Sequence, residues 1–325
     1  MRFSVLINGG AGSVDDSDSD GQVKAIEEAF VAAGAEADVE IVEPADFQAT
    51  MRRIWDGPAR PAAIVVAGGD GTVNCAAGEA VGTDLVVGVL PFGTFNHFAK
   101  DLGIPVDLTE AAASLVSGEE RQVDIGEVNG RVFVNNSALG VYPAMVAVRD
   151  RIRHQRGWGK VRAVPVAAVR VLRAFPVHRF DLRGSDGFSR TRVRTPFVFV
   201  GNGAYDNDSG KVGDRGSLDD GQLGLYVARV VSRWGLIRTV LRTMVSGTQA
   251  ARDLDRAELA EFEVSGHVRR LRVALDGEIA WMETPLRYKS CPGALRVLAP
   301  APPPADPEPS DPNLAILDEV DADEP

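Results

Sequence analysis

A run of six apolar residues at 62–67 leads directly into the loop 68–72 (Gly-Gly-Asp-Gly-Thr). Continuous apolar runs of this length are typical of central strands in a parallel sheet, which are buried on both faces. A second apolar run at 85–90 ends in 91–94 (Pro-Phe-Gly-Thr), and helical spacing follows each loop. We therefore expect two neighbouring strand–loop–helix units, with both loops at the carboxyl edge of one sheet, where ligands bind in such folds.

The same alternation of strand and helix continues on either side of these units. Further strands are expected at 3–7 and 38–42, and further helices at 22–34, 46–56 and 107–117. This order predicts an α/β domain with an open, mostly parallel sheet and helices on both faces. We assign residues 1–122 to this domain and expect 292–300 to rejoin it.

Beyond residue 121 the pattern changes to short alternating segments rich in Val, Arg, Phe and Thr. These segments are 121–128, 131–138, 178–184, 192–200, 222–230, 258–264 and 268–276. Alternation with a period of two predicts antiparallel strands, and we expect them to form a β-sandwich. Helical stretches near 141–174 and 232–250 interrupt the strands. We assign 123–291 to this second domain and expect the active site in the cleft between the domains.

The segment 301–325 is proline-rich and carries eight acidic residues but no basic residue. It accounts for −8 of the formal net charge of −11, so the rest of the chain is close to neutral. A segment of this composition is expected to be disordered. Two cysteines do not make a disulfide framework, and no apolar stretch approaches the roughly 18 residues of a membrane span. We therefore expect a cytoplasmic protein.

The two glycine-rich loops have the composition of a phosphate-binding site. Glycine lets backbone N–H groups approach phosphate oxygens closely, and a helix that begins behind the loop adds a favourable dipole. The hydroxyl groups of Thr72 and Thr94 are further donors, while Asp70 suits a water molecule, a metal ion or a ribose hydroxyl. The alternative is a tight turn that needs glycine for its geometry alone. No Gly-x-x-x-x-Gly-Lys-Ser/Thr loop is present, which excludes a P-loop enzyme.

Two segments resemble the signatures of a known enzyme family. Residues 68–74 (Gly-Gly-Asp-Gly-Thr-Val-Asn) resemble the first signature of the diacylglycerol kinase catalytic domain family, whose superfamily includes sphingosine, ceramide and NAD kinases. Residues 90–100 (Leu-Pro-Phe-Gly-Thr-Phe-Asn-His-Phe-Ala-Lys) resemble the second signature, which favours lipid kinases over NAD kinases. The resemblance is greatest to bacterial soluble members. It implies an enzyme that uses ATP and Mg²⁺ to phosphorylate diacylglycerol or a similar lipid.

The resemblance also implies which residues form the site. The implied nucleotide-binding residues are Asn8, Gly12, Gly68, Gly69, Asp70, Gly71, Thr72, Asn74 and Thr94. Asp70 and Asp124 are implied in the water network of a catalytic metal ion. The loop 217–222 resembles a structural magnesium loop, with the Asp220 carboxylate and the carbonyl groups of Ser217 and Gln222 as ligands.

Residues 276–278 (Asp-Gly-Glu) resemble the carboxylate motif of the family's second domain. There Glu278 is the implied general base, with Asp276 beside it as a second catalytic residue. Asp-Gly is also a strong signal for a hairpin turn, and the loop 219–221 (Asp-Asp-Gly) has the same alternative interpretation. Three residues depart from the family pattern, namely Gly9 in place of proline, Cys75 in place of glutamate and His97 in place of aspartate. The aspartate missing at His97 belongs to the family's polar network around the catalytic metal.

Two segments, 149–173 and 229–245, combine several arginines with tryptophan and aliphatic residues. Basic amphipathic helices suit an anionic membrane surface. The alternative is an ordinary core-facing helix with a solvated basic face. No nucleic-acid recognition motif accompanies these segments. We expect a membrane lipid substrate, peripheral contact with an anionic membrane surface through both segments, and no nucleic-acid partner; a homodimer is left open.

The leading hypothesis is an ATP-dependent lipid kinase whose β-sandwich domain binds the lipid. A ceramide or sphingoid-base kinase would use the same fold. An NAD kinase is disfavoured by the second signature and by the basic segments. A catalytically silent lipid- or nucleotide-binding regulator stays open because of Gly9, Cys75 and His97, although the intact 276–278 motif argues against it.

Overall fold

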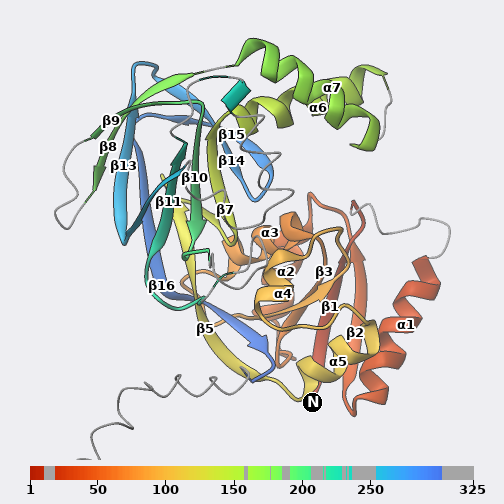
Figure 1. Ribbon diagram of the computed structural model, residues 1–325. Coiled ribbons are helices and arrows are strands. Elements are labelled where there is room, and N and C mark those ends of the chain that lie inside the picture. Colours follow the sequence, from red (N-terminus) through yellow and green to blue (C-terminus); the bar gives the residue numbers. More distant parts are fainter. Residues whose placement is uncertain are drawn as a thin grey trace, which may run out of the picture.

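The computed structural model describes two parts of the chain that lie side by side (Figure 1). An α/β part is built from the first third of the sequence, and a β-rich part carries a pair of helices at its far end. The described residues are 1–10, 19–156, 160–175, 177–184, 191–205, 215, 217–228, 232, 234–235 and 254–301.

The α/β part alternates strands and helices as the sequence pattern predicts. Its elements are β1 (Arg2–Asn8), α1 (Ser19–Ala32), β2 (Glu36–Val42), α2 (Phe47–Trp55), β3 (Ile64–Gly68), α3 (Asp70–Ala80), β4 (Val86–Pro91), α4 (His97–Asp101) and α5 (Leu108–Val116). The strands lie in the order β2-β1-β3-β4, and every neighbouring pair among them is parallel. The predicted fold class of this part is confirmed.

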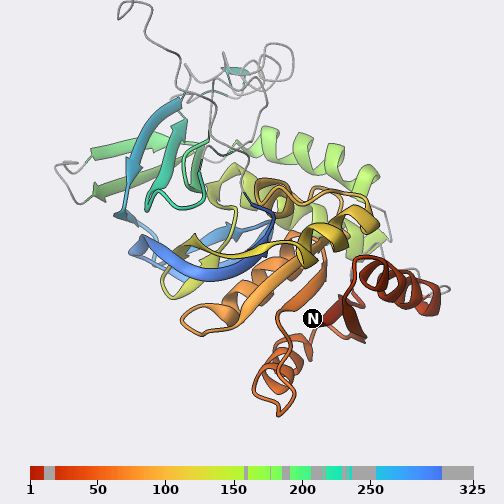
Figure 2. The same ribbon diagram turned by 90° about the horizontal axis from the view of Figure 1, so that it is seen from below.

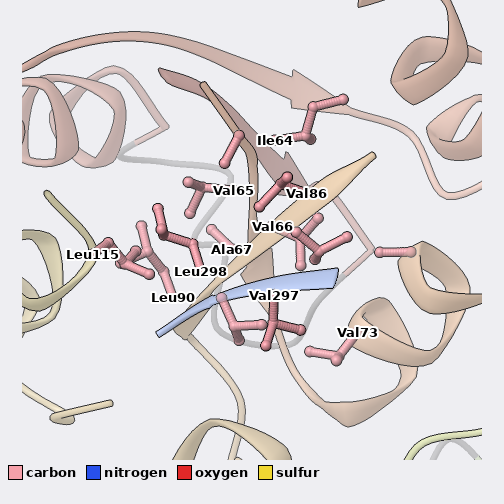
Figure 3. Close-up of a cluster of buried hydrophobic side chains, with 14 of the residues drawn as sticks. Ile64, Val65, Val66, Ala67, Val73, Val86, Leu90, Leu115, Val297 and Leu298 are labelled. Atoms are coloured by element: carbon pink, nitrogen blue, oxygen red, sulfur yellow. The ribbon is translucent and has the colours of Figure 1, made fainter. Parts of the chain in front are cut away.

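The core of the α/β part forms around β3, which is buried along its whole length. Figure 3 shows side chains of the central strands packed with Leu115 from α5 and Val73 from α3. Burial of each such aliphatic side chain contributes about 1.5–3 kcal/mol. The strand ends from which the glycine loops begin are thereby held on a rigid base.

The β-rich part is an antiparallel sandwich, again as predicted. Its elements are β5 (Glu119–Val128), β6 (Arg131–Phe133), β7 (Asn136–Gly140), α6 (Val141–Arg156), α7 (Lys160–Ala174), β8 (His178–Gly184), β9 (Thr191–Thr195), β10 (Phe197–Asn202), β11 (Leu223–Ala228), β12 (Leu254–Leu259), β13 (Glu261–Gly266), β14 (Arg270–Leu275), β15 (Glu278–Glu283) and β16 (Leu286–Ala299). One sheet has the order β12-β11-β10-β7-β14-β15, and the other contains β13, β8 and β9. Phe133, Phe262 and Tyr288 lie in the core that the two sheets share.

The strand β16 belongs to both parts and joins their sheets. Near its C-terminal end, Arg296 and Val297 pair in parallel with β4, whereas its first residues pair antiparallel with β13. β5 runs antiparallel along β16, with a register shift between Cys291 and Leu295. Figure 2 shows β16 as the long blue strand that curves across the middle of the molecule. This 14-residue strand therefore sets the position of one part relative to the other.

Several element boundaries differ from those that alternation predicts. The expected strand 131–138 is divided into β6 and β7, and 192–200 is divided into β9 and β10 at Pro196. The sequence pattern does not predict β16 as one strand because it contains Pro292 and Gly293, which usually interrupt strands. It also does not predict β15, which begins and ends with glutamate.

The helical stretch expected at 141–174 forms two packed helices, α6 and α7. The helix expected at 232–250 and the tail 301–325 lie almost entirely outside the described residues. Among the helices that the structure describes, none is long and apolar enough to cross a bilayer.

A hydrogen bond of 3.0 Å joins Tyr288 of β16 to Ser137 of β7 inside the sandwich, where both side chains are buried. The substitution Tyr288→Phe removes this bond and deprives the Ser137 hydroxyl of its partner. We expect the free energy of unfolding to fall by about 1–3 kcal/mol, which urea unfolding followed by circular dichroism would measure. An unchanged stability would show that the bond does not help to hold the two sheets together.

Candidate active site

The two glycine loops form one continuous backbone surface at the carboxyl ends of β3 and β4. A Cβ atom on Gly93 would stand 2.5 Å from the Cα atom of Gly69, so no side chain fits between the loops. The Phe92 N–H donates to the Gly68 carbonyl at 3.2 Å across the same contact. Asn96, whose φ of 52° is left-handed, fixes the second loop by accepting a hydrogen bond from Gly93 N and donating one to Gly93 O, both at 2.8 Å.

The first loop is supported from beneath by Thr72. A Cβ atom on Gly68 would collide with the buried Thr72 side chain. Asn8, at the end of β1, donates from Nδ2 to Thr72 Oγ1 at 2.8 Å. Three neighbouring strand ends therefore meet here, with Thr72 buried as a support and Thr94 exposed in the second loop. The predicted residue Gly12 lies outside the described residues.

The helix α3 begins at Asp70, with Gly69 in extended conformation as its N-cap. The positive end of the helix dipole therefore faces the loop, which favours an anionic group there. Gly71 lies in the first turn of the same helix, so its backbone is fixed by the helix that follows. This geometry supports the interpretation that the loop binds phosphate.

The motif 276–278 forms a two-residue hairpin turn between β14 and β15. Asp276 and Gly277 have φ values of 46° and 88°, and Leu275 pairs with Glu278 across the turn. Positive φ at both central residues defines the type I′ turn that favours Asp-Gly. The turn brings Glu278 to the first glycine loop, because a Cβ atom on Gly71 would stand only 3.3 Å from Glu278 Oε1. The hairpin interpretation and the catalytic one are therefore compatible.

The Asp276 carboxylate holds the chain segment between β6 and β7 rather than facing open solvent. It accepts hydrogen bonds from the backbone N–H groups of Val134 (2.8 Å), Asn135 (2.9 Å) and Asn136 (2.8 Å). Burial raises its pKa to about 6, while these N–H groups and the nearby guanidinium of Arg215 act in the opposite direction. Both carboxylate oxygens are thus engaged, which makes Asp276 a residue that positions the hairpin.

Asn74 of α3 contacts the same carboxylate. With its amide oriented so that nitrogen faces the acceptors, it donates to Asp276 Oδ2 at 3.1 Å and to the Val132 carbonyl at 3.2 Å. The predicted residue Asn74 therefore links the glycine-loop helix to the β14–β15 turn. These bonds connect the two parts beside the site, and the contact of Asn74 with the nucleotide stays a prediction.

Sequence reasoning does not single out three residues that contact this arrangement. Asn135 donates from Nδ2 to Asp70 Oδ1 at 3.3 Å, and Arg215 forms a buried ion pair with Asp101 beside it. Asn135 lies within a segment whose alternation predicts a plain strand, although two successive asparagines are unusual in strand interiors. For Arg215 and Asp101 the sequence offers no signal, since they are brought together by the fold.

Comparison with known proteins bears on these observations. The model of the diacylglycerol kinase catalytic domain matches residues 2–128, and that of the YegS C-terminal NAD kinase beta sandwich-like domain matches 140–299. A Pseudomonas aeruginosa protein named "Probable lipid kinase YegS-like" is 30% identical over 74% of this chain and 77% of its own length. The chain belongs to the diacylglycerol kinase catalytic domain family. It is therefore a lipid kinase, and membership of a kinase family implies ATP as its phosphoryl donor.

Other relatives agree with this assignment. A Mycobacterium tuberculosis (strain H37Rv) protein named "Diacylglycerol kinase" is 28% identical over 73% of this chain and 77% of its own length. A solved diacylglycerol kinase structure from Bacillus anthracis str. Sterne superposes with a TM-score of 0.61 at 18% identity, covering 92% of this chain and 96% of that one. The latter similarity shows the shared fold.

Asp124 of this lipid kinase is buried next to the predicted magnesium loop. Its Oδ1 accepts from Gly293 N at 2.8 Å, and its Oδ2 accepts from Gly221 N at 2.6 Å. Its backbone N–H also donates to the Leu218 carbonyl at 2.7 Å. These bonds tie the loop to the irregular part of β16. The assignment of Asp124 to a metal–water network with Asp70 stays a prediction.

The loop 217–222 has features that fit a bound cation. Burial raises the pKa of Asp220, and the charges of nearby carboxylates, Asp124 among them, raise it further. A cation would relieve this repulsion. The buried Oδ1 atom of Asn202, whose amide donates to the Asp124 carbonyl, has no hydrogen-bond partner among the described residues. The Gln222 carbonyl already accepts from Gly203 N at 3.0 Å, so a metal would share this oxygen.

The grouping of acidic side chains by itself does not define a metal centre. In the described ranges no three His, Cys, Asp or Glu side chains are grouped so that they could hold a metal ion. Any ion at Asp70 or at the loop 217–222 would therefore need carbonyl oxygens or water as additional ligands, as Mg²⁺ commonly does.

The three departures from the family pattern lie around the loops. His97 is exposed and stacks on the ring of Phe95, with ring centroids 5.7 Å apart. Cys75 is half-buried, and burial raises the pKa of its thiol, with the charge of Glu278 adding to the effect. The thiol is thereby held in its neutral form. Gly9 donates to the Val42 carbonyl at 2.9 Å.

Gly71→Ala should separate activity from stability. The new Cβ atom would stand 3.3 Å from Glu278 Oε1 and displace this carboxylate by a few tenths of an ångström, so we expect phosphoryl transfer to fall by roughly threefold to tenfold. Because Gly71 lies in α3, the alanine should preserve stability or raise it by about 0.5–1 kcal/mol. Transfer of labelled phosphate from ATP and thermal unfolding are measured on the same preparation. Full activity in the variant would argue against a role for the close approach of Glu278 to the first glycine loop.

Proposed function

We propose that this lipid kinase transfers the γ-phosphoryl group of ATP to the hydroxyl group of diacylglycerol or a similar lipid alcohol. The observation that carries the proposal is the position of Glu278 Oε1, which lies 3.3 Å from where a Cβ atom on Gly71 would stand. It places a carboxylate of the β-sandwich beside the glycine loop, where it could accept the hydroxyl proton. Relatives named diacylglycerol kinase support this class of acceptor.

The glycine loops supply the nucleotide half of the proposed site. Phosphoryl transfer requires the reacting groups to be aligned and their charge to be neutralised. The loop 68–72, which leads into the N-terminus of α3, offers backbone N–H groups for the phosphates, and the exposed Thr94 of the second loop offers its hydroxyl. Asp70, with Asp124 as the second assigned carboxylate, would hold the water network of Mg²⁺, which supplies the neutralising charge. The loop 217–222 would hold a structural Mg²⁺.

Glu278 is the proposed general base. It is exposed, so a lipid hydroxyl can reach its carboxylate. A base held at this position typically accelerates transfer by roughly 10²–10⁴-fold. Asp276, whose oxygens are engaged by three backbone N–H groups, instead keeps the turn that carries Glu278 in place.

The helix pair α6–α7 is the proposed route to the membrane. Ile152 and Ala167 are buried in a small cluster between the helices, while Arg151, Arg170 and Arg173 are exposed. In Figure 1 the pair lies beside β14 and β15, and α6 contacts both strands. Contact of these exposed arginines with an anionic bilayer would therefore bring lipid close to the turn that carries Glu278. The second basic segment, 229–245, lies almost wholly outside the described residues.

The acceptor is tested with purified protein, labelled ATP, Mg²⁺ and a panel of diacylglycerol, ceramide, sphingosine and NAD. We expect diacylglycerol to be phosphorylated and Glu278→Ala to lower its kcat by about 10²–10⁴-fold, because the base is lost from an exposed position. If ceramide, sphingosine or NAD were labelled and diacylglycerol were not, the labelled compound would be the acceptor and the proposal of diacylglycerol would be wrong. No labelling of any acceptor would contradict the proposed reaction.

A companion variant separates the two carboxylates of the turn. Asp276→Asn keeps the shape but turns one acceptor into a donor that faces a backbone N–H, so it should lose stability as well as activity. Glu278→Ala should leave the thermal midpoint unchanged. Equal loss of stability in both variants would argue that Glu278 is a structural residue.

Membrane contact is tested by reversing the charges of Arg151, Arg170 and Arg173 to glutamate. Each basic residue near an anionic surface contributes about 1 kcal/mol, so binding to phosphatidylserine vesicles should weaken by about 100-fold or more. Sedimentation with vesicles measures the bound fraction.

The matched control reverses three exposed basic residues of the α/β part, Arg2, Lys24 and Arg53. It changes the net charge by the same amount, but in the α/β part and not in α6–α7. Vesicle binding should stay close to that of the unmodified protein. Equal weakening in both triple variants would show that net charge, and not the α6–α7 face, determines binding.

A further inference from the structure

A buried arginine lies between the two parts of the molecule. The Arg215 side chain is 1% exposed and forms an ion pair with Asp101, which is itself 11% exposed. Asp101 is the last residue of α4, the helix that begins directly after the second glycine loop. Arg215 lies in the connection between β10 and β11 of the sandwich. The ion pair therefore links the sandwich to the loop surface of the α/β part.

The guanidinium of Arg215 uses all three of its nitrogen atoms. Nε and Nη2 donate to Asp101 Oδ2, the first of them at 2.9 Å. Nη1 donates to the carbonyl groups of Val134 (2.8 Å) and Asn202 (2.9 Å). Nη2 also donates to Asn135 Oδ1 at 3.2 Å. A planar fork of donors held in this way has one orientation only.

Asn135 connects this arginine to the glycine loop. It is buried, and its amide accepts from Arg215 through Oδ1 while donating through Nδ2 to Asp70 Oδ1 at 3.3 Å. Arginine can only donate and a carboxylate only accepts, so the amide orientation is fixed by chemistry at both ends. The Asn135 backbone is fixed as well, by the Asp276 carboxylate and by Asn202 N, which donates to its carbonyl at 3.0 Å.

We propose that Asn135 and Arg215 are positioning residues that set the orientation of the Asp70 carboxylate for phosphoryl transfer. The chain of contacts Asp101–Arg215–Asn135–Asp70 starts at α4, the helix after the second glycine loop, and ends at the first glycine loop. The second domain thereby holds both loops in one relative position. This inference rests on the proposed function, in which Asp70 acts beside the nucleotide phosphates.

A structural role alone does not account for the arrangement. Buried ion pairs often add little to stability compared with apolar residues of the same size. What this pair provides is a fixed direction for the Asn135 amide, and hence for one oxygen of Asp70. Groups that orient a carboxylate near a metal or phosphate typically change metal affinity or activity by about 10–100-fold when they are replaced.

Two substitutions test the proposal. Asn135→Asp keeps the size and still accepts from Arg215, but it replaces the donor facing Asp70 with a repelling carboxylate oxygen. Arg215→Lys keeps the charge beside Asp101, but a single ammonium group cannot reach Asp101, Val134 and Asn135 together. The control is Tyr288→Phe, which removes a buried hydrogen bond to Ser137 in β7, immediately after this segment, without touching Asp70.

Turnover and Mg²⁺ dependence are the two measurements. We expect kcat for lipid phosphorylation to fall by about 10–100-fold in both site variants, with the KM for ATP much less affected. Binding of fluorescent ATP is titrated with Mg²⁺ in the absence of lipid. The Mg²⁺ midpoint of this binding should shift in opposite directions in the two site variants. The midpoint should move to lower Mg²⁺ in Asn135→Asp, because a negative charge is added, and to higher Mg²⁺ in Arg215→Lys, because Asp70 loses its support.

The control variant should keep the kcat and the Mg²⁺ midpoint of the unmodified protein even though its thermal midpoint falls. If both site variants lose only thermal stability, as the control does, the proposal is wrong and the contacts serve the fold alone. If the unmodified protein phosphorylates none of the lipids, the proposed function fails. In that case the Mg²⁺ titration of ATP binding tests the positioning role by itself. Mg²⁺ midpoints that are unchanged in both site variants would overturn this role.

Discussion

Gly69 and Gly93 bring two backbones into direct contact, and no side chain can enter between them. Because the loops touch, the helices that begin behind them, α3 and α4, have a fixed relative position. Asp70 at the start of α3 and Asp101 at the end of α4 therefore stand at defined points of one surface. The contacts that the β-sandwich makes with the site through Glu278, Asn135 and Arg215 depend on this surface being rigid.

On the sandwich side, the matching element is the short segment 134–136, which runs from the end of β6 into the first residue of β7. Its backbone N–H groups bind Asp276, while two of its carbonyl groups accept from Asn202 and from the guanidinium of Arg215. The backbone groups that lose their strand partners at this interruption thus find hydrogen-bond partners in side chains and in the backbone nearby. The same segment supports the turn that carries Glu278, and it also carries the Asn135 amide that faces Asp70. The positions of Glu278 and Asp70 are therefore coupled through this short stretch of backbone.

Local features of the sequence predict much of the fold, because apolar runs, alternation and glycine loops act over a few residues. The parallel strands and the positions of both loops follow from such features, and the sandwich follows from the change to alternating segments. The contacts of Asn135 and Arg215 could not be predicted, since they join residues far apart in sequence through hydrogen bonds that no local pattern encodes. Strand β16 could not be predicted for another reason. Its Pro292 and Gly293 are residues that usually end a strand, whereas the fold accommodates them in a register shift where Gly293 N donates to Asp124.

The shared strand β16 has a consequence for how the chain reaches this structure during synthesis. The neighbour that β4 requires, at Arg296 and Val297, leaves the ribosome only after the whole sandwich has been made. Until then β4 presents an open edge, which in nascent proteins favours wrong pairing with other chains. The α/β part therefore cannot complete its sheet as an independent unit. Its last step of assembly must wait for the other part, so the two mature together.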